Sequence, residues 1–267
     1  MTDLEIFVSR SPFLAALLAS FVAGTLATAA GALPMLFLRG LSDRASNLLL
    51  SFAAGVMLAA TVFSLLLPGL AAAEVQIADR RWATLVMIAA LGAGGLMLWL
   101  IHRFVPHEHF CKGCESDRTG RLTRIWMFVI AIALHNVPEG MAVGIGAGSG
   151  DLKIGLGVTL GIGLQNLPEG LAVAVGLMAA GYGRTQAFWL AAATGVLETF
   201  GGLVGAGFVV LSASLLPWAL GFAAGAMLFV ISGEVIPETH RSGFERGATA
   251  ALFVGFSAML FLDTALL

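Results

Sequence analysis

Long apolar stretches, separated by short polar segments, follow one another along the entire chain. Each stretch is long enough to cross a bilayer as a helix, because about 20 residues at 1.5 Å per residue span a hydrocarbon core of about 30 Å. Hydropathy predicts eight membrane-spanning helices, over residues 13–38, 46–70, 82–104, 123–147, 152–180, 184–211, 215–239 and 246–266. The stretches are continuous rather than alternating, which argues against a transmembrane β-barrel. The predicted fold class is an all-α polytopic membrane protein, with a single transmembrane domain over residues 1–267.

Composition supports this prediction. The chain is 58% hydrophobic and 11% charged, with a mean hydropathy of +0.94, whereas a soluble domain is about 25% charged. The 34 glycines fit close packing of membrane helices. No basic tract indicates a nucleic-acid partner, and the partner implied throughout is the lipid bilayer. The first apolar stretch follows no basic region and is longer than a signal-peptide core, so we expect it to be a retained span.

The distribution of Lys and Arg predicts the orientation. The side reached after the first, third, fifth and seventh spans carries Arg39, Arg44, Arg103, Lys112, Arg118, Arg121, Arg124, Arg184, Arg241 and Arg246. The other side carries Arg10, Arg80, Arg81 and Lys153. Because Lys and Arg are enriched in cytoplasmic loops, we expect a multi-pass protein of the cell (inner or plasma) membrane with both termini extracytoplasmic.

Two near-copies of one motif lie in the fourth and fifth predicted spans: His135-Asn136-Val137-Pro138-Glu139-Gly140 and Gln165-Asn166-Leu167-Pro168-Glu169-Gly170. In each copy the first and fifth residues share one helix face, because they are four positions apart. The proline cannot donate a hydrogen bond to the carbonyl four residues before it, so each motif is predicted to open its helix and free a carbonyl oxygen. The asparagine on the adjacent face can add an amide oxygen.

Acidic residues occur inside the predicted spans, although no Lys or Arg does. They are Glu139, Glu169, Glu198, Glu234 and Asp263, with Glu238 near a helix end. A carboxylate at mid-membrane costs roughly 2.5–3.5 kcal/mol on insertion scales, so each must be protonated, face water or bind a cation. Glu234 and Asp263 lie nearer the helix ends, where they are either interfacial acids or points on an ion path.

Counting along the helices places four side chains at a similar depth. His135, Gln165, Glu198 and Met57 each lie roughly 17–21 Å from the start of their predicted helix, at 1.5 Å per residue. Four helices could therefore converge on one metal site near mid-membrane. Imidazole suits zinc, iron, copper or nickel, and carboxylates suit harder ions such as manganese, so the set favours a divalent transition metal. The alternative is that the polar side chains only join helices by hydrogen bonds and that Met57 only fills the core.

The loop over residues 105–122, predicted to be cytoplasmic, holds a second group of metal-ligand residues. They are His107, His109, Cys111 and Cys114. His-x-His followed by Cys-x-x-Cys offers four ligands of the type that zinc prefers. The functional interpretation is a metal acceptor or sensor near the exit, and the alternative is an ordinary solvated loop.

An internal repeat is also visible. Ser51–Leu58 (SFAAGVML) in the second span matches Gly221–Leu228 (GFAAGAML) in the seventh. Helices five spans apart run in opposite directions, as do the fourth and fifth. This favours an inverted repeat of spans 1–3 and 6–8 around a central 4/5 pair, which is typical of secondary transporters. Chance similarity between helices rich in Ala and Gly is the alternative.

These motifs closely resemble the ZIP (Zrt/Irt-like) family of divalent metal transporters, over nearly the whole chain, and most of all its bacterial branch in which the second motif begins with Gln. The resemblance implies transport toward the cytosol. By position it implies a metal site that comprises Met57, His135, Glu139, Gln165 and Glu169. It also matches Asn136, Asn166 and Glu198 to a neighbouring second-metal position, where some relatives have an acid in place of Asn166.

We therefore interpret the chain as an importer of zinc, with cadmium, iron and manganese as further candidates, that works by alternating access. It is not expected to be an enzyme, because His-Glu-x-x-His and Gly-x-Ser-x-Gly are absent from the sequence. A proton- or sodium-coupled cation exchanger of another family and a membrane metal sensor remain as alternatives. The glycine-rich helix faces would allow a homodimer.

Overall fold

The computed structural model describes residues 3–38, 41–104, 136–179, 181–240 and 243–266. These residues form helices joined by short turns, and no strand occurs among them, which confirms the all-helical prediction for this part of the chain. The helices are α1 (Asp3–Arg10), α2 (Pro12–Ser20), η1 (Phe21–Leu26), α3 (Ala27–Ala32), η2 (Leu33–Leu36), α4 (Asp43–Ala60), η3 (Thr61–Leu66), α5 (Leu67–Gln76), α6 (Arg80–Phe104), α8 (Leu152–Ala179), α9 (Arg184–Leu211), η4 (Ala213–Leu215), α10 (Leu216–Val230), η5 (Ile231–Val235), α11 (Ile236–His240), α12 (Glu245–Phe261) and η6 (Leu262–Leu266). A further helical segment covers residues 136–148.

Within the described ranges, seven helices are long and apolar enough to cross a membrane. They are Pro12–Leu36, Asp43–Gln76, Arg80–Ile101, Leu152–Ala179, Arg184–Leu211, Leu216–Val235 and Glu245–Ala265. They correspond to seven of the eight predicted spans, and the helical segment 136–148 is the described part of the remaining one, predicted over 123–147. His135 and the loop ligands His107, His109, Cys111 and Cys114 lie outside the described residues.

The second span is longer than predicted at both ends. Its first turn begins beyond Ser42, whose hydroxyl accepts a hydrogen bond from the Ala45 amide at 3.2 Å, as a helix N-cap does. At the other end the span continues to Gln76. Pro68 does not end it, because the helix changes to a π-helical pattern in η3 just before this proline and continues as α5.

Four segments are π-helical, a feature that the sequence did not predict. They are η1, η3, η5 and η6. η3 and η5 each stand just before a proline, Pro68 and Pro237. A proline leaves the carbonyl four residues before it without its α-helical donor, which favours a local change of hydrogen-bond pattern. The proline of the second motif behaves differently, since α8 runs without interruption through Pro168; the predicted opening of the helix is not seen there.

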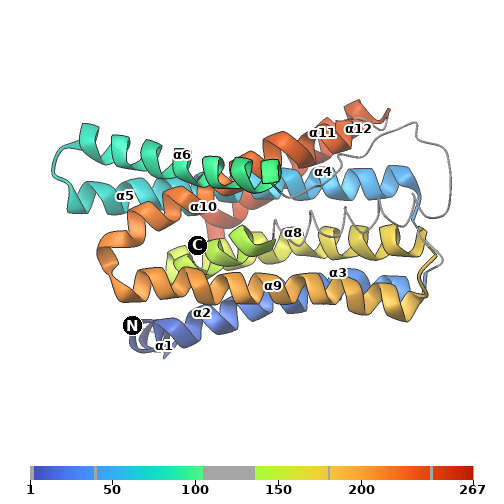
Figure 1. Cartoon of the computed structure of the whole chain (residues 1–267), viewed down its shortest axis with the longest axis horizontal. Coiled ribbons are helices and arrows are strands. Elements are labelled where there is room, and N and C mark those ends of the chain that lie inside the picture. The colour runs from blue at the N-terminus through green and yellow to red at the C-terminus, as the bar shows by residue number, and fades with distance from the viewer. Residues whose placement is uncertain (1–2, 39–40, 105–135, 180, 241–242, 267) are drawn as a thin grey trace.

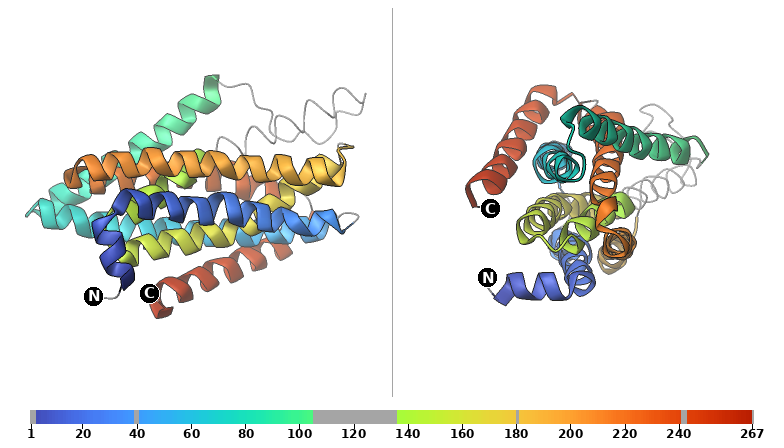
Figure 2. Two further views of the ribbon diagram at one scale, coloured as in Figure 1. Left: turned by 90° about the horizontal axis from the view of Figure 1, so that it is seen from below. Right: turned by 90° about the vertical axis from the view of Figure 1, so that its left-hand side faces the viewer.

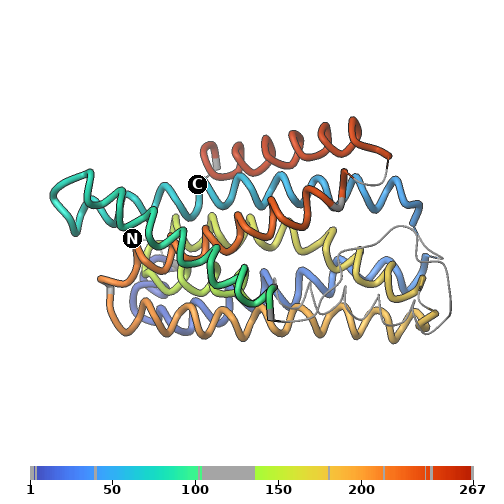
Figure 3. Tube along the Cα trace, turned by 45° about the horizontal axis from the view of Figure 1, so that its top comes forward, coloured from blue at the N-terminus to red at the C-terminus, as the bar shows by residue number. Residues whose placement is uncertain are grey.

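The helices form two bundles packed side by side (Figures 1 and 2). The motif bundle comprises α2, η1 and α3, the segment 136–148, α8 and α9. The second bundle comprises α4, η3 and α5, α6, α10, η5 and α11, and α12. α3 and α9 pack on α8 in the first. In the second, α12 packs on α4 and α10 packs on α6, and Figure 3 shows α12 alongside α4. α4 also packs against α8, which joins the two bundles.

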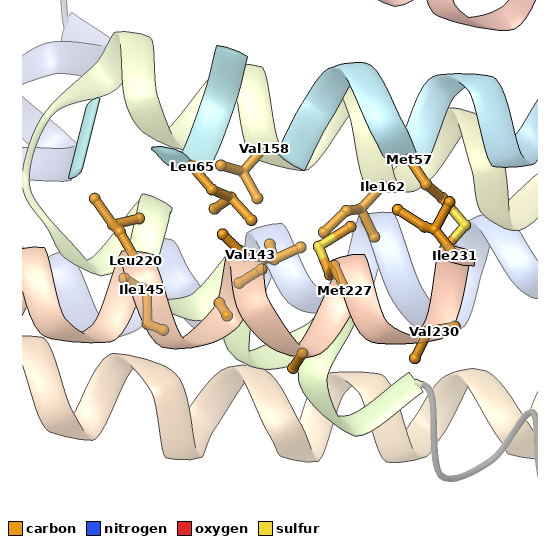
Figure 4. Close-up of a cluster of buried hydrophobic side chains, with 14 of the residues drawn as sticks. Met57, Leu65, Val143, Ile145, Val158, Ile162, Leu220, Met227, Val230 and Ile231 are labelled. Carbon is orange, nitrogen blue, oxygen red and sulfur yellow. The ribbon is translucent and has the colours of Figure 1, made fainter. Parts of the chain in front are cut away.

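The largest apolar cluster lies between the bundles (Figure 4). Both contribute to it: Val143, Ile145, Val158 and Ile162 come from the motif bundle, and Met57, Leu65, Leu220, Met227, Val230 and Ile231 from the second. Along their helices, many of these residues lie between the level of the motifs and the end of the molecule that carries the turns at residues 77–79, 149–151 and 212–215. Apolar side chains therefore fill the space between the bundles toward that end.

Glycines allow the helices of the second bundle to touch through their backbones. A Cβ built on Gly225 of α10 would overlap the Leu91 carbonyl of α6, whereas a Cβ built on Gly92 of α6 would meet no atom of the described residues within 4 Å. Close backbone approach through small residues is the usual way in which membrane helices associate.

This difference predicts opposite outcomes for two similar substitutions. Gly225→Ala should destabilise the protein by about 1–3 kcal/mol, the usual cost of overpacking. Gly92→Ala should be neutral or slightly stabilising, because alanine has a higher helix propensity. Thermal unfolding of the purified protein in detergent measures both, and an equal effect of the two substitutions would contradict the predicted contact.

Candidate metal centre

The second motif places buried amides in the middle of α8. Gln165 and Asn166 are fully buried (0% exposed). Glu169, one turn further on, is half-buried, although one of its carboxyl oxygens is buried. In the first motif Asn136 and Glu139 are also buried, at 0% and 2% exposed. The described parts of both motifs therefore turn polar side chains into the protein rather than toward lipid.

A hydrogen bond joins the two motifs directly. The Gln165 Nε2 donates to Glu139 Oε1 at 2.6 Å. Because Nε2 makes this bond, the amide oxygen Oε1 of Gln165 is directed elsewhere, and it has no hydrogen-bond partner among the described residues. The fourth and fifth predicted spans are thus brought together at the motifs, as the depth count predicted.

Asn166 connects α8 to two further helices. Its Nδ2 lies 2.8 Å from both carboxyl oxygens of Glu198 in α9 and 2.7 Å from the Ala23 carbonyl oxygen in η1. Three acceptor oxygens therefore surround one amide nitrogen. Glu198 itself is 0% exposed, so α9 brings a buried carboxyl group into this region.

Three carboxyl groups gather around these amides. Glu139, Glu169 and Glu198 are close enough to interact electrostatically with one another. The salt bridge found among the described residues, Arg80 with Glu74, involves none of these three acids. Burying like charges together without a compensating positive charge is costly, so the cluster favours a cation or protons at this place.

Several polar atoms of the two motifs have no hydrogen-bond partner within the described part of the chain. They are Asn136 Oδ1 and Nδ2, Glu139 Oε2, Gln165 Oε1, Asn166 Oδ1 and Glu169 Oε1. A buried polar atom without a partner costs roughly 1–3 kcal/mol. Five of the six are oxygens, and carboxylate and amide oxygens are suitable ligands for a metal ion.

The carboxylates alone do not complete a metal site. Among the residues that the structure describes, no three His, Cys, Asp or Glu side chains converge closely enough to hold a metal ion. A metal ion at this place would therefore need further ligands, and the amide oxygens of Gln165, Asn166 and Asn136 are available as such. His135 lies outside the described residues.

The other predicted site residues come from α4, η5, α11 and η6. Met57 is buried at 4% exposed, in the cluster between the bundles, and Figure 4 places it close to Ile231. Asp263 accepts a hydrogen bond from the Ser64 hydroxyl at 2.9 Å, which links η6 to η3. Glu234 is half-buried in η5. The side chain of Glu238 is not among those described.

The glycine that closes each motif has a packing role. A Cβ on Gly140 would overlap the Glu198 backbone, and a Cβ on Gly170 would overlap the backbone of Thr28. The motif glycines thus allow the segment 136–148 to touch α9, and α8 to touch α3.

Sequence reasoning missed the contribution of the first span. Thr25 Oγ1 lies 2.8 Å from Thr199 Oγ1 and donates to the Gly195 carbonyl oxygen at 3.1 Å. Thr199 Oγ1 also lies 3.2 Å from the Ser20 carbonyl oxygen, so its single hydrogen is donated either to that oxygen or to Thr25 Oγ1. The available signal was the presence of two threonines in apolar stretches, and hydropathy alone does not reveal that they face each other.

Comparison with known proteins identifies the family to which this architecture belongs. The family model described as ZIP Zinc transporter matches residues 106–263. The chain is 49% identical over 244 residues to Zinc transporter ZIPB of Bordetella bronchiseptica, covering 91% of this chain and 79% of that protein. The chain belongs to the ZIP family. Zinc transporter GufA of Myxococcus xanthus is 45% identical over 252 residues, covering 94% and 99% of the two chains.

More distant ZIP proteins match part of the chain. Zinc transporter ZIP11 of Homo sapiens is 44% identical over 149 residues, which cover 54% of this chain and 44% of that protein. Membership of the ZIP family confirms the resemblance on which the sequence interpretation relied. The prediction of a transporter rather than an enzyme also agrees with the description of the family.

Proposed function

We propose that this ZIP family member transports zinc across the membrane through a site between its two motifs. The observation that carries the proposal is the group of buried carboxyl and amide oxygens, without hydrogen-bond partners among the described residues, around Glu139, Gln165 and Glu169. The names of its relatives support zinc as the substrate. Cadmium, iron and manganese stay as further candidates, because imidazole and carboxylate ligands also suit them.

In the proposed site, zinc is bound by His135, Glu139, Gln165 and Glu169, with Met57 as a thioether ligand. The hydrogen bond between Gln165 and Glu139 orients both groups. The Gln165 nitrogen faces Glu139, which leaves the Gln165 oxygen and Glu139 Oε2 to face the metal. Two carboxylates would balance the charge of a dication in this low-dielectric environment.

We propose that Asn166 limits the site to one metal ion. Its amide nitrogen lies within 2.7–2.8 Å of both Glu198 oxygens and the Ala23 carbonyl oxygen. This nitrogen thus occupies a position bounded by three oxygens that could otherwise receive a second cation. Glu198 and Asn136 would then lie beside the bound zinc and influence it electrostatically without being its ligands.

We propose that the spans before and after the central pair form an inverted repeat. α4 and α10 run in opposite directions (Figure 1), and each carries a glycine at the same position of the repeated sequence. Gly55 of α4 lies against the Leu252 carbonyl of α12, and Gly225 of α10 lies against the Leu91 carbonyl of α6. Exchanging the second span with the seventh, and the third with the eighth, turns one contact into the other.

The contacts made in the opposite direction, by a glycine of α12 with α4 and by a glycine of α6 with α10, correspond in the same way. Gly255 of α12 lies against the Phe52 carbonyl, and Gly94 of α6 lies against the Phe222 carbonyl. Phe52 and Phe222 are again equivalent positions of the repeated sequence. η3 and η5 also begin at equivalent positions after it, so the π-helical segments follow the proposed repeat.

The motif bundle supports the repeat in the same way. The contact of Gly140 with Glu198 corresponds to that of Gly170 with Thr28. A second pair of contacts joins Gly201 to the Val137 carbonyl and Gly31 to the Leu167 carbonyl. In this correspondence Glu198 of α9 is equivalent to Thr28 of α3. Only one half of the repeat therefore supplies a carboxylate from its first helix, which makes the proposed site asymmetric.

For alternating access, we propose that the motif bundle moves as a unit against the second bundle. The hydrogen bonds of Gln165, Asn166 and Thr25 all lie within the motif bundle, and that of Ser64 with Asp263 lies within the second. Between the bundles lies the apolar cluster of Figure 4, which would close the end that carries residues 77–79 and 149–151. With the predicted orientation, this end is extracytoplasmic and uptake proceeds toward the cytosol.

Zinc flux into liposomes that contain the purified protein tests the proposed function. The wild type should take up zinc, whereas His135→Ala/Glu169→Ala should show no uptake above that of empty liposomes. Equal fluxes would mean that the motifs are structural. Tight zinc binding without flux would favour the sensor, and flux that requires a sodium gradient would favour an exchanger of another type. Competition by cadmium, iron and manganese in the same assay orders the substrates.

A further inference from the structure

Three consecutive residues of the first span approach the candidate metal centre, although none is charged. They are Ala23, Gly24 and Thr25, and all lie in η1. This segment is π-helical, and π-helical segments in long helices are rare and often occur at functional sites. Each of the three residues makes a different contact with the region around Glu198.

Gly24 leaves the space that the Glu198 side chain occupies. A Cβ built on Gly24 would lie 2.8 Å from the Cβ of Glu198, 3.0 Å from its Cδ and 3.1 Å from its Cγ. Real side chains do not pack at such distances, so one of the two groups would have to move. The backbone of Glu198 also meets Gly140 of the first motif. Glu198 is therefore in contact with two glycines from two different helices.

The neighbours of Gly24 attach η1 to the groups around Glu198. The Ala23 carbonyl oxygen accepts a hydrogen bond at 2.7 Å from the Asn166 nitrogen that also contacts the Glu198 carboxyl group. Thr25 bonds to Gly195 and Thr199 of α9, one on each side of Glu198 in the sequence. These contacts hold η1 in register with α9, so Gly24 stays directly opposite the Glu198 side chain.

We propose that Ala23, Gly24 and Thr25 are positioning residues for the zinc site, with Gly24 setting the place of the Glu198 carboxyl group. None of the three side chains needs to touch the metal. They act by holding Glu198 against Asn166, so the carboxyl group keeps one orientation while zinc binds and leaves. The inference rests on the proposed function, because it concerns the same site.

Substitutions at two glycines, Gly24 in η1 and Gly163 in α8, provide the test. Gly24→Ala should raise the zinc Kd about 10–100-fold, the usual cost of disturbing groups that orient metal ligands. Gly163→Ala on α8 is the matched control, because its Cβ would lie 3.6 Å and 3.8 Å from Ala23 atoms, which is ordinary contact. This control should leave the Kd within about twofold, since contacts at van der Waals distance cost little. Isothermal titration calorimetry in detergent measures both values.

A double-mutant cycle separates positioning from general packing. In a Glu198→Gly background, the Cβ, Cγ and Cδ atoms with which Gly24→Ala clashes are all absent, so the added effect of Gly24→Ala on the zinc Kd should be largely lost. A merely structural role would give the same change in Kd in both backgrounds and would overturn the proposal. So would a Gly24→Ala variant with the Kd of Gly163→Ala.

Hydroxyl removal keeps the proposal testable if Gly24→Ala does not fold, which size-exclusion chromatography would reveal. Thr25→Val keeps the shape of the side chain and should raise the zinc Kd about tenfold. The double variant Thr25→Val/Thr199→Val should be little worse than Thr25→Val alone, because the two hydroxyls bond to each other. A zinc Kd unchanged by Thr25→Val would overturn the positioning role of η1.

The outcomes distinguish this inference from the proposed function. If the wild type takes up no zinc, the proposed function fails and the inference fails with it. If the wild type takes up zinc but Glu198→Gly binds zinc as the wild type does, Glu198 does not influence the site and only the inference is wrong. If both behave as proposed and Gly24→Ala still matches its control, only the role of η1 is wrong.

Discussion

Replacing Glu139 with glutamine is expected to abolish zinc uptake. The substitution keeps the size of the side chain, but it removes the charge that faces the metal in the proposed site. Glu139 Oε1 accepts the hydrogen bond from Gln165, and Oε2 has no partner among the described residues, so this carboxyl group is both oriented and available. Loss of an outer-shell group costs 10–100-fold in metal affinity, and loss of a charged ligand should cost more, about a hundredfold or above. Zinc flux into proteoliposomes and the zinc Kd of the purified protein measure the effect.

A control for this variant comes from an acid outside the candidate centre. Glu245 is exposed at the beginning of α12, so Glu245→Gln should leave zinc flux unchanged. Thermal unfolding of Glu139→Gln should show a folded protein, because the variant relieves repulsion from Glu169 and Glu198. A folded Glu139→Gln variant with wild-type uptake would exclude Glu139 as a zinc ligand.

Replacing Asn166 with aspartate is expected to raise zinc binding from one ion to two per chain. The new carboxylate would face both Glu198 oxygens and the Ala23 carbonyl oxygen in place of the Asn166 nitrogen. Without a donor at the centre, these oxygens repel one another, and a cation is needed to hold them together. The variant should therefore unfold at lower temperature than the wild type without zinc and recover when zinc is added, because binding to the native state stabilises it.

Elemental analysis and calorimetry of the purified protein measure the number of bound ions. Asn166→Ala is the control, because it also removes the donor but adds no negative charge, and it should still bind a single zinc ion. Two zinc ions in the wild type would show that the Asn166 nitrogen does not exclude a second metal. A single ion in Asn166→Asp would mean that the three oxygens do not form a cation site.

Much of the molecule could be predicted from the sequence, because the relevant signals are local. Hydropathy is a property of consecutive residues, and it located seven spans that the described structure also contains. The two motifs were recognisable because each compresses an amide, a proline and a carboxylate into one helical turn. The sequence also identified Glu139 and Glu198 as acids inside apolar spans, which must be protonated, face water or bind a cation.

The sequence was less informative where hydrogen-bond patterns change within a helix. The π-helical segment η1 contains no proline, so its π-helical hydrogen-bond pattern could not be predicted from its residues. In the other direction, Pro168 was expected to open α8, yet the helix continues through it. Packing by neighbouring helices stabilises both arrangements, and the local helix propensity of the residues does not depend on those neighbours.

The sequence alone determined the helical class, the approximate spans and the polar residues of the two motifs, because these depend on composition and on spacing within one helix. Only the tertiary structure decided which side chains meet: that Gln165 bonds to Glu139, that Asn166 bonds to Glu198, and that Gly24 lies against Glu198. The physical reason is that these contacts depend on how each helix is rotated about its axis and how closely two backbones approach. Both are set by packing between helices distant in sequence.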